Sequence, residues 1–172
     1  MQVFLIRHPR PLIEAGVCYG RLDIDCENPL PVAERLKSAL PPGVPVISSP
    51  LRRARRLAEA LADQVFIDER LAEIDFGEWE GKRWDDIERK AIDAWAADVS
   101  GFTPPGGESV ADLQRRVIGF ADSLDRPRVA LVSHAGVLRA LVGHWRCLPF
   151  AEWSQLTFDF GSMTLVDLEQ AA

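Results

Sequence analysis

The run VFLIRHP at residues 3–9 decides the fold. Residues 3–7 form a largely apolar, β-prone stretch, and Pro9 and Pro11 end it. We therefore expect a buried strand that carries the polar pair Arg7 and His8 to its carboxyl end. In α/β folds, ligands bind at that edge of the sheet.

The same layout returns near the end of the chain. Residues 129–132 are another apolar run, Ser133 and His134 follow it, and a helix is expected over residues 136–145. Two further strands are predicted over residues 44–47 and 163–168. Because strands alternate with helices, the sequence predicts an α/β protein: a three-layer α/β/α sandwich with a mostly parallel central sheet.

Three further helices are expected between these strands. Ser49 and Pro50 suit the start of the first, and Ser109 suits the N-cap of the third. Helical spacing relates the apolar residues within each segment: Ala54, Leu57, Leu61 and Val65; then Trp84, Ile87, Ala91 and Trp95; then Val110, Leu113, Val117, Phe120 or Ala121, and Leu124. These stripes are interpreted as core.

Length and charge limit the classes of protein to consider. The 172 residues fit one domain, residues 1–172. The net charge of −6 disfavours binding to nucleic acid or anionic lipid, and no leader or membrane span is recognised, so we expect a cytoplasmic protein. The three cysteines show no C-x-x-C spacing, so neither a disulfide framework nor a zinc site is predicted.

Basic and imidazole side chains follow the predicted strand ends. Arg7 and His8 lie after the first strand, an arginine-rich turn with Arg53 follows the second, and His134 follows a later one. Because a guanidinium presents a planar fork to two phosphate oxygens, this set suits a phosphate site in an otherwise acidic protein. Among phosphate chemistries, one with a histidine nucleophile needs no metal, and no cofactor is predicted.

Five ordered motifs resemble the histidine phosphatases, also called the phosphoglycerate-mutase-like superfamily. The resemblance covers nearly the whole chain and rests on FLIRHP, SSPLRRA at 48–54, LAEIDFGEWEG at 71–81, GGES at 106–109 and VSHAG at 132–136. A single Arg-His pair would be weak, but five matches in order are specific.

This resemblance implies a role for each matching residue. His8 would be the nucleophile that accepts the phosphoryl group, and Arg7 and Arg53 would clamp its oxygens. His134 would donate to the same oxygens, helped by the backbone N–H of Ala135 at a helix start. Glu73 would protonate the leaving oxygen.

The chain departs from the family after the Arg-His pair. The family usually continues with Gly, whereas Pro9 here has no backbone N–H. Arg10 or Arg21 is a candidate for replacing that donor and binding substrate. RHPRP together with GVCYGRLD at 16–23 resembles the α-ribazole phosphatases of cobalamin assembly, and the short stretch at 82–105 favours hydrolysis over transfer.

The predicted function is hydrolysis of a small phosphorylated metabolite, and other readings stay open. A mutase-like transferase, a broad-specificity phosphatase and a non-catalytic phosphate-binding or phosphoprotein-binding module are alternatives. His8, His134 and Glu73 are also candidate ligands of a metal site, although the neighbouring arginines argue against a bound cation.

The ring of Trp84 is a candidate for lining a pocket that binds a flat substrate, and His144 is given no role. Oligomeric state is open.

Overall fold

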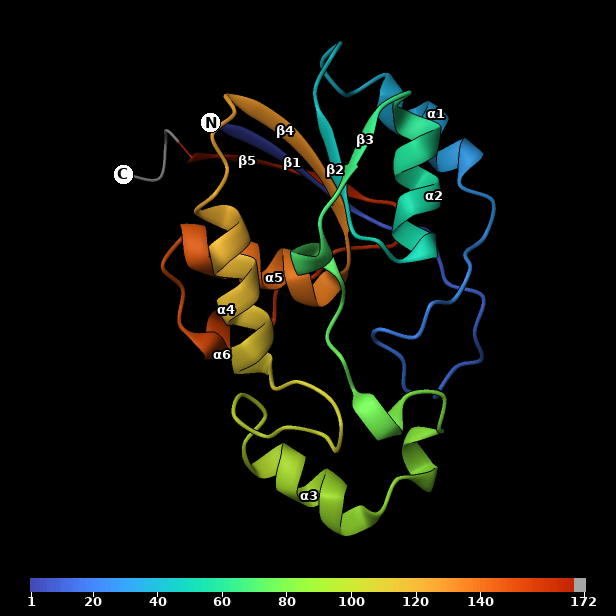
Figure 1. Cartoon of the computed structure of the whole chain (residues 1–172), viewed down its shortest axis with the longest axis vertical. Coiled ribbons are helices and arrows are strands. Elements are labelled where there is room, and N and C mark those ends of the chain that lie inside the picture. Colours follow the sequence, from blue (N-terminus) through green and yellow to red (C-terminus); the bar gives the residue numbers. More distant parts are fainter. Residues whose placement is uncertain (169–172) are drawn as a thin grey trace.

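A five-stranded sheet forms the centre of the computed structural model, which describes residues 1–168 (Figure 1). The strands are β1 (Gln2–Arg7), β2 (Val46–Ser48), β3 (Val65–Ile67), β4 (Arg128–Ser133) and β5 (Met163–Asp167). Their order is β3-β2-β4-β1-β5, and only β5 runs antiparallel to its neighbour. The predicted α/β fold with a mostly parallel sheet is confirmed.

Helices cover both faces of this sheet (Figure 1). On one face lie α1 (Leu30–Lys37) and α2 (Arg52–Leu61), and on the other lie α4 (Val110–Ala121), α5 (Ala135–Trp145) and α6 (Phe150–Trp153). A further helix, α3 (Arg89–Ala97), lies away from the sheet. Short 3-10 turns span Glu69–Leu71, Gly77–Trp79 and Trp84–Asp86.

Side chains of β1 alternate between the two hydrophobic cores. Val3 and Leu5 pack in the core beneath α4 and α5, whereas Phe4 and Ile6 pack in the core beneath α1 and α2. A strand covered on both faces needs apolar residues at successive positions. This explains why the first strand is a continuous apolar run in the sequence.

The parallel register brings three strand ends together. Arg7 pairs with Ser133, and Ser48 pairs with Val132. Just beyond the strands, the His8 N–H donates to the Ser133 carbonyl at 3.1 Å, and the Ser49 N–H donates to the Val132 carbonyl at 2.9 Å. The residues after β1, β2 and β4 therefore meet at one edge of the sheet.

Helix α4 begins as predicted from Ser109. The Ser109 hydroxyl accepts the Asp112 N–H at 3.1 Å, and the Asp112 carboxylate accepts the Ser109 N–H at 3.2 Å. This reciprocal capping box satisfies two N–H groups that a helix start would otherwise leave unpaired. The expected core stripe is buried at Leu113 and Val117.

The helix after Pro50 differs from the prediction at both ends. Its N-cap is Leu51 and not Ser49, whose hydroxyl accepts the Leu51 N–H at 3.2 Å before the helix starts. The helix ends at Leu61 because Ala62 is extended, and Val65 then begins β3. The helical spacing of Val65 was therefore coincidental, and pairing with β2 fixes its structure. Strand β3 and helix α1 were not predicted.

The predicted helix over residues 84–95 is broken. A 3-10 turn covers Trp84–Asp86, Ile87 is extended, and α3 starts only at Arg89. The rings of Trp84 and Trp95 nevertheless stack, with centroids 5.6 Å apart. They pack on a small hydrophobic cluster around Trp79, so contacts between aromatic rings, more than helical periodicity, organise this segment.

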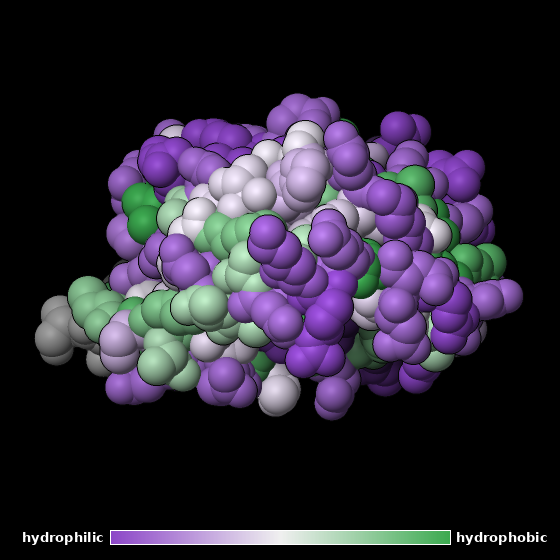
Figure 2. Space-filling view, turned by 90° about the horizontal axis from the view of Figure 1, so that it is seen from below, coloured by the Kyte–Doolittle hydropathy of each residue, from purple (hydrophilic) through white to green (hydrophobic). Residues whose placement is uncertain are grey.

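Hydrophilic side chains cover most of the face seen in Figure 2, and hydrophobic residues form smaller groups between them. Within residues 1–168, the helices are all too short or too polar to cross a membrane.

Candidate active site

His8 lies at the edge where the strand ends meet, with 2% of its surface exposed. Its Nδ1 lies 2.6 Å from the Pro9 carbonyl oxygen. Since a carbonyl only accepts hydrogen bonds, a neutral ring must carry its proton on Nδ1, which leaves a lone pair on Nε2. Burial, with the charges of Arg53 and Arg7, lowers the pKa of His8 to about 3, so the ring is neutral at physiological pH.

Two arginines lie beside this ring, each held by a backbone carbonyl. Arg7 donates from Nη1 to the Phe158 carbonyl at 2.6 Å, and its Cζ lies 3.7 Å from the centroid of the Phe160 ring. Arg53 is fully buried and donates to the carbonyls of Leu22 at 2.9 Å and Gly20 at 2.5 Å. Burial lowers the pKa of both guanidinium groups, but an arginine remains charged in proteins.

His134 follows β4, and its ring centroid lies 5.0 Å from that of His8. The ring is fully buried, and its Nε2 lies 2.7 Å from the Ser49 hydroxyl oxygen. Burial, followed by the nearby His8 and Arg53, keeps the pKa of His134 well below its usual value. A second neutral imidazole therefore lies beside the first.

Three buried nitrogen atoms of this group have no hydrogen-bond partner within residues 1–168: Nε of Arg7, Nε of Arg53 and Nδ1 of His134. Leaving a buried donor unpaired costs about 1–3 kcal/mol, and a charged one costs more. Two such guanidinium donors and an unpaired imidazole nitrogen beside one neutral imidazole suit the binding of an oxyanion.

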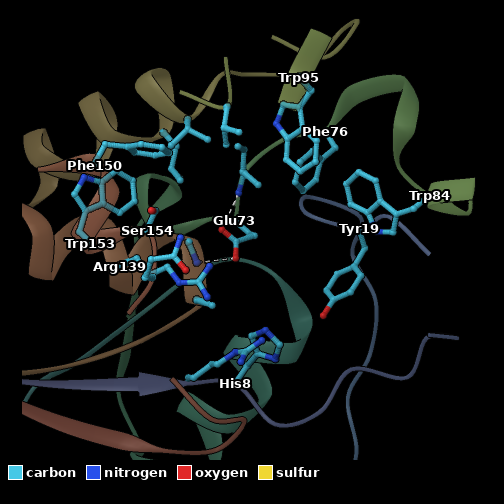
Figure 3. A pocket seen from close by; sticks show the side chains of 18 of the residues that line it. His8, Tyr19, Glu73, Phe76, Trp84, Trp95, Arg139, Phe150, Trp153 and Ser154 are labelled. Carbon is cyan, nitrogen blue, oxygen red and sulfur yellow. Dashed lines mark hydrogen bonds between the residues drawn. The ribbon is translucent and has the colours of Figure 1, made fainter. Parts of the chain in front are cut away.

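In Figure 3, Glu73 lies above His8, and its side chain contacts the N-terminus of α5. Its Oε2 accepts the Gly136 N–H at 3.1 Å, and its Oε1 accepts the N–H of Ile74 at 3.0 Å. Ala135, whose N–H was predicted to help bind the anion, is the first residue of α5 and lines the same cavity. The first N–H groups of a helix have no partner within it and attract anions.

Residues of the surrounding layer hold the Glu73 segment in place. Arg116 donates to the Glu73 carbonyl at 3.1 Å and forms an ion pair with Glu108. The Ser133 hydroxyl donates to the Leu71 carbonyl at 2.7 Å, so it is not directed at His134 as a nucleophile would be. Glu73 therefore has a supported backbone and a carboxylate that enters the cavity.

Replacing Gly136 by alanine tests the position of that carboxylate. A Cβ at this residue would lie 2.4 Å from Glu73 Oε1, so the side chain of Glu73 must move. We expect kcat to fall about tenfold or more, because Glu73 is the predicted proton donor and a small displacement of such a group carries a large kinetic cost. Alanine is a better helix former than glycine, so the melting temperature should change little. Unchanged kcat in a folded variant would contradict this position for the acid.

A cavity of about 520 Å³ opens beside these residues (Figure 3). Arg7, His8 and Glu73 line it, whereas Arg53 and His134 are not part of its lining. Arg139 also faces it, and its Nε donates to the Leu156 carbonyl at 2.7 Å. Aromatic side chains line much of the remaining wall: Tyr19, Phe76, Trp84, Trp95, Phe150 and Trp153. The cavity therefore combines charged side chains with a large aromatic surface.

The structure does not bring Arg10 and Arg21 into this cavity. Arg10 is exposed, and its Nε lies 3.9 Å from a Glu27 carboxylate oxygen. Its Cζ lies 5.3 Å from the centroid of the Phe160 ring, which itself packs on Arg7. Arg21 is also exposed, and its backbone N–H donates to a Glu80 carboxylate oxygen at 2.7 Å. Neither arginine lines the cavity in place of the missing Pro9 donor.

The partners of two residues around the site could not be read from the sequence. Phe160 stacks against Arg7, and nothing in the sequence near it signals such a contact. Glu80 accepts N–H groups from Arg21, Leu22 and Phe76, so it joins the loop that holds Arg53 to the loop that carries Glu73. The family motif contains this glutamate, but only the folded chain shows what it binds.

His8, His134 and Glu73 do not form a metal-binding group. Within residues 1–168, no cluster of three or more histidine, cysteine, aspartate or glutamate side chains has a geometry that would hold a metal ion. His134 Nε2 is instead directed to Ser49, and the Glu73 carboxylate to a helix N-terminus.

Known proteins resemble this chain in sequence and in fold. A glucosyl-3-phosphoglycerate phosphatase of Mycolicibacterium vanbaalenii is 32% identical over 179 residues, which cover 90% of this chain and 78% of that protein. A Thermus thermophilus crystal structure superposes with a TM-score of 0.79 at 34% identity, covering 97% and 94% of the two chains. An Escherichia coli protein provisionally named an alpha-ribazole-5'-P phosphatase has the same fold, with a TM-score of 0.86 at 24% identity over 96% of this chain and 89% of that one.

These relatives support phosphatase activity on small phosphorylated molecules. The model of the histidine phosphatase superfamily (branch 1) matches residues 3–172. With the five motifs, the mostly parallel sheet and the paired histidines at its edge, this match shows that the chain belongs to the histidine phosphatase superfamily.

Proposed function

We propose that the protein hydrolyses a small phosphomonoester through a phosphohistidine formed on His8, without a metal ion. The observation that carries this proposal is a buried, neutral imidazole with a free Nε2, next to two buried guanidinium donors and a buried imidazole nitrogen that have no partner within residues 1–168. Such donors stabilise charge on the transferring phosphoryl group without reorganising during the reaction.

In the first step, the Nε2 lone pair of His8 attacks phosphorus and the bond to the ester oxygen breaks. Glu73 transfers a proton to that oxygen, so the product leaves as an alcohol. The Nδ1 proton of His8 stays on the ring and is donated to the Pro9 carbonyl, which stabilises the positive charge that the ring gains. Arg7, Arg53 and His134 bind the non-bridging oxygens throughout.

In the second step, water attacks phosphohistidine. The Glu73 carboxylate takes a proton from the water, the N–P bond breaks, and its electron pair returns to Nε2. Inorganic phosphate is the product, and both catalytic groups recover their starting protonation states. One carboxyl group can serve as acid and then as base because the two steps are chemically the reverse of each other.

We propose α-ribazole 5'-phosphate as the substrate. The RHPRP and GVCYGRLD motifs support this proposal, and so does the aromatic wall of the cavity. In that wall the rings of Phe76 and Trp84 pack edge to face, with their centroids 5.5 Å apart. A flat benzimidazole-type base packs well on such rings. The phosphate would lie at the His8 end of the cavity, with the base toward Trp84.

Comparison of substrates tests this assignment with a chelator present. We expect kcat/KM for α-ribazole 5'-phosphate to exceed that for 3-phosphoglycerate and for nucleoside monophosphates. Trp84→Ala should lower the value for α-ribazole 5'-phosphate about tenfold more than the value for 3-phosphoglycerate, because only the flat base loses its wall. The matched control is Phe66→Ala, since that ring is exposed on β3 and does not line the cavity.

Equal, slow rates across this panel would contradict the assignment to α-ribazole 5'-phosphate. Complete inactivity with tight binding of inorganic phosphate would instead favour the non-catalytic module. Activity that the chelator abolishes would contradict the metal-free mechanism.

A further inference from the structure

We propose that Ser49 is a positioning residue that fixes which nitrogen of His134 carries the proton. The proposal rests on the phosphate site described above and adds a residue to it. Ser49 belongs to the turn after β2, whereas His134 follows the neighbouring strand β4. Their side chains meet because Ser49 N–H donates to the Val132 carbonyl at 2.9 Å, which keeps the two strand ends in register.

The hydrogen bonds of Ser49 determine the direction of its contact with His134. The Ser49 hydroxyl oxygen has two partners: the Leu51 N–H at 3.2 Å and Nε2 of His134 at 2.7 Å. The Leu51 N–H can only donate, so the hydroxyl accepts there. Ser49 is fully buried, and its own proton must find an acceptor, because an unpaired buried donor is costly. Nε2 of His134 is the acceptor within reach.

This direction sets the tautomer of His134. Burial and the neighbouring cations hold the pKa of the ring well below its usual value, so the ring is neutral and carries one proton. When Nε2 accepts from Ser49, that proton lies on Nδ1. Nδ1 is buried and has no partner in the described chain. His134 is predicted to donate to the phosphate, and a protonated Nδ1 would be the atom that donates. The opposite tautomer would present a lone pair to an anion and repel it.

Ser48 provides a matched comparison. It is also fully buried, but its hydroxyl donates to the Ser49 carbonyl at 2.9 Å and does not contact the ring. Removing either hydroxyl therefore deletes one oxygen atom, from neighbouring residues at the end of β2. Only the loss at Ser49 should affect the tautomer of His134.

Nitrogen-15 NMR of the histidine rings in the whole protein tests the proposal directly. Coupling patterns between ring protons and nitrogens distinguish a protonated nitrogen from one with a lone pair, and His134→Gln assigns the signals. We expect His134 to be protonated on Nδ1 in the wild-type protein and in Ser48→Ala. In Ser49→Ala we expect a mixture of both tautomers.

Kinetics provide the second readout. Ser49→Ala should lower kcat about tenfold or more with a smaller change in KM, because the Nδ1 donor acts most strongly on the transferring phosphoryl group. Ser49→Thr, which retains the hydroxyl, should recover most of kcat, and Ser48→Ala should stay near wild type.

A wild-type ring protonated on Nε2 would overturn the proposal even if Ser49→Ala failed to fold, and would leave the proposed phosphatase activity standing. A folded Ser49→Ala variant with unchanged tautomer and kcat would overturn it too.

Discussion

Replacing His8 by alanine should lower kcat/KM by at least about 10⁴-fold, the scale of loss seen when an enzyme loses its nucleophile. The variant loses the one neutral imidazole whose Nε2 is free to attack phosphorus, since the proton on Nδ1 is held by the Pro9 carbonyl. The arginine donors remain, so inorganic phosphate should still bind. Initial rates on an aryl phosphate and on α-ribazole 5'-phosphate, with chelator present, provide the measurement.

His144→Ala is the control for that loss. His144 lies near the end of α5 on the same helix that starts at the site, and its Nε2 contacts Asp122 at 3.2 Å. It does not line the cavity, so its variant should retain nearly wild-type rates. A folded His8→Ala enzyme with more than about 1% of wild-type kcat/KM would rule out His8 as the nucleophile.

Arg53→Lys should lower kcat/KM about 100-fold or more, although the positive charge is retained. Arg53 uses two terminal nitrogens on the carbonyls of Gly20 and Leu22, and its Nε is left for the phosphoryl group. A lysine ammonium is a point charge that cannot make this set of bonds, and an arginine that stabilises a transferring phosphoryl group contributes about 10³-fold or more. The loss should be mainly in kcat, measured under saturating substrate.

The matched control lies on the same helix. Arg55 is exposed and forms an ion pair with Glu59 at 2.7 Å, so Arg55→Lys should leave kcat unchanged. A melting curve separates lost catalysis from lost folding, because Arg53 also holds the loop at Gly20. Equal kcat for Arg53→Lys and wild type would show that Arg53 does not bind the phosphoryl group.

There is a physical reason why the sequence predicted the sheet and the edge at which the polar residues after its strands meet. Buried strands such as β1 need apolar residues on both faces, so they are visible as continuous runs, and parallel strands bring the residues after their carboxyl ends to one edge. Arg7, His8 and His134 therefore had predictable places at this edge. Arg53 lies beyond β2, and it was singled out only because the SSPLRRA motif matches the family.

Features that depend on distant contacts were not predictable in the same way. Val65 has helical spacing but pairs with β2 as a strand, because tertiary pairing outweighs a local pattern. The aromatic wall joins Tyr19, Trp95 and Phe150, which lie far apart in the chain. Arg10 and Arg21 were candidates because of their positions in RHPRP and GVCYGRLD, and the structure places both at the exposed surface, outside the lining of the cavity.

Trapping the phosphoenzyme tests the account most directly. The enzyme would be mixed with phosphorus-32-labelled substrate, quenched in alkaline detergent, which preserves acid-labile phosphohistidine, and digested for peptide mapping. We expect label on the peptide that contains His8, formed as fast as turnover requires and absent from His8→Ala. Label on the imidazole of His134, or full turnover with no labelled protein at any time, would contradict a phosphohistidine on His8.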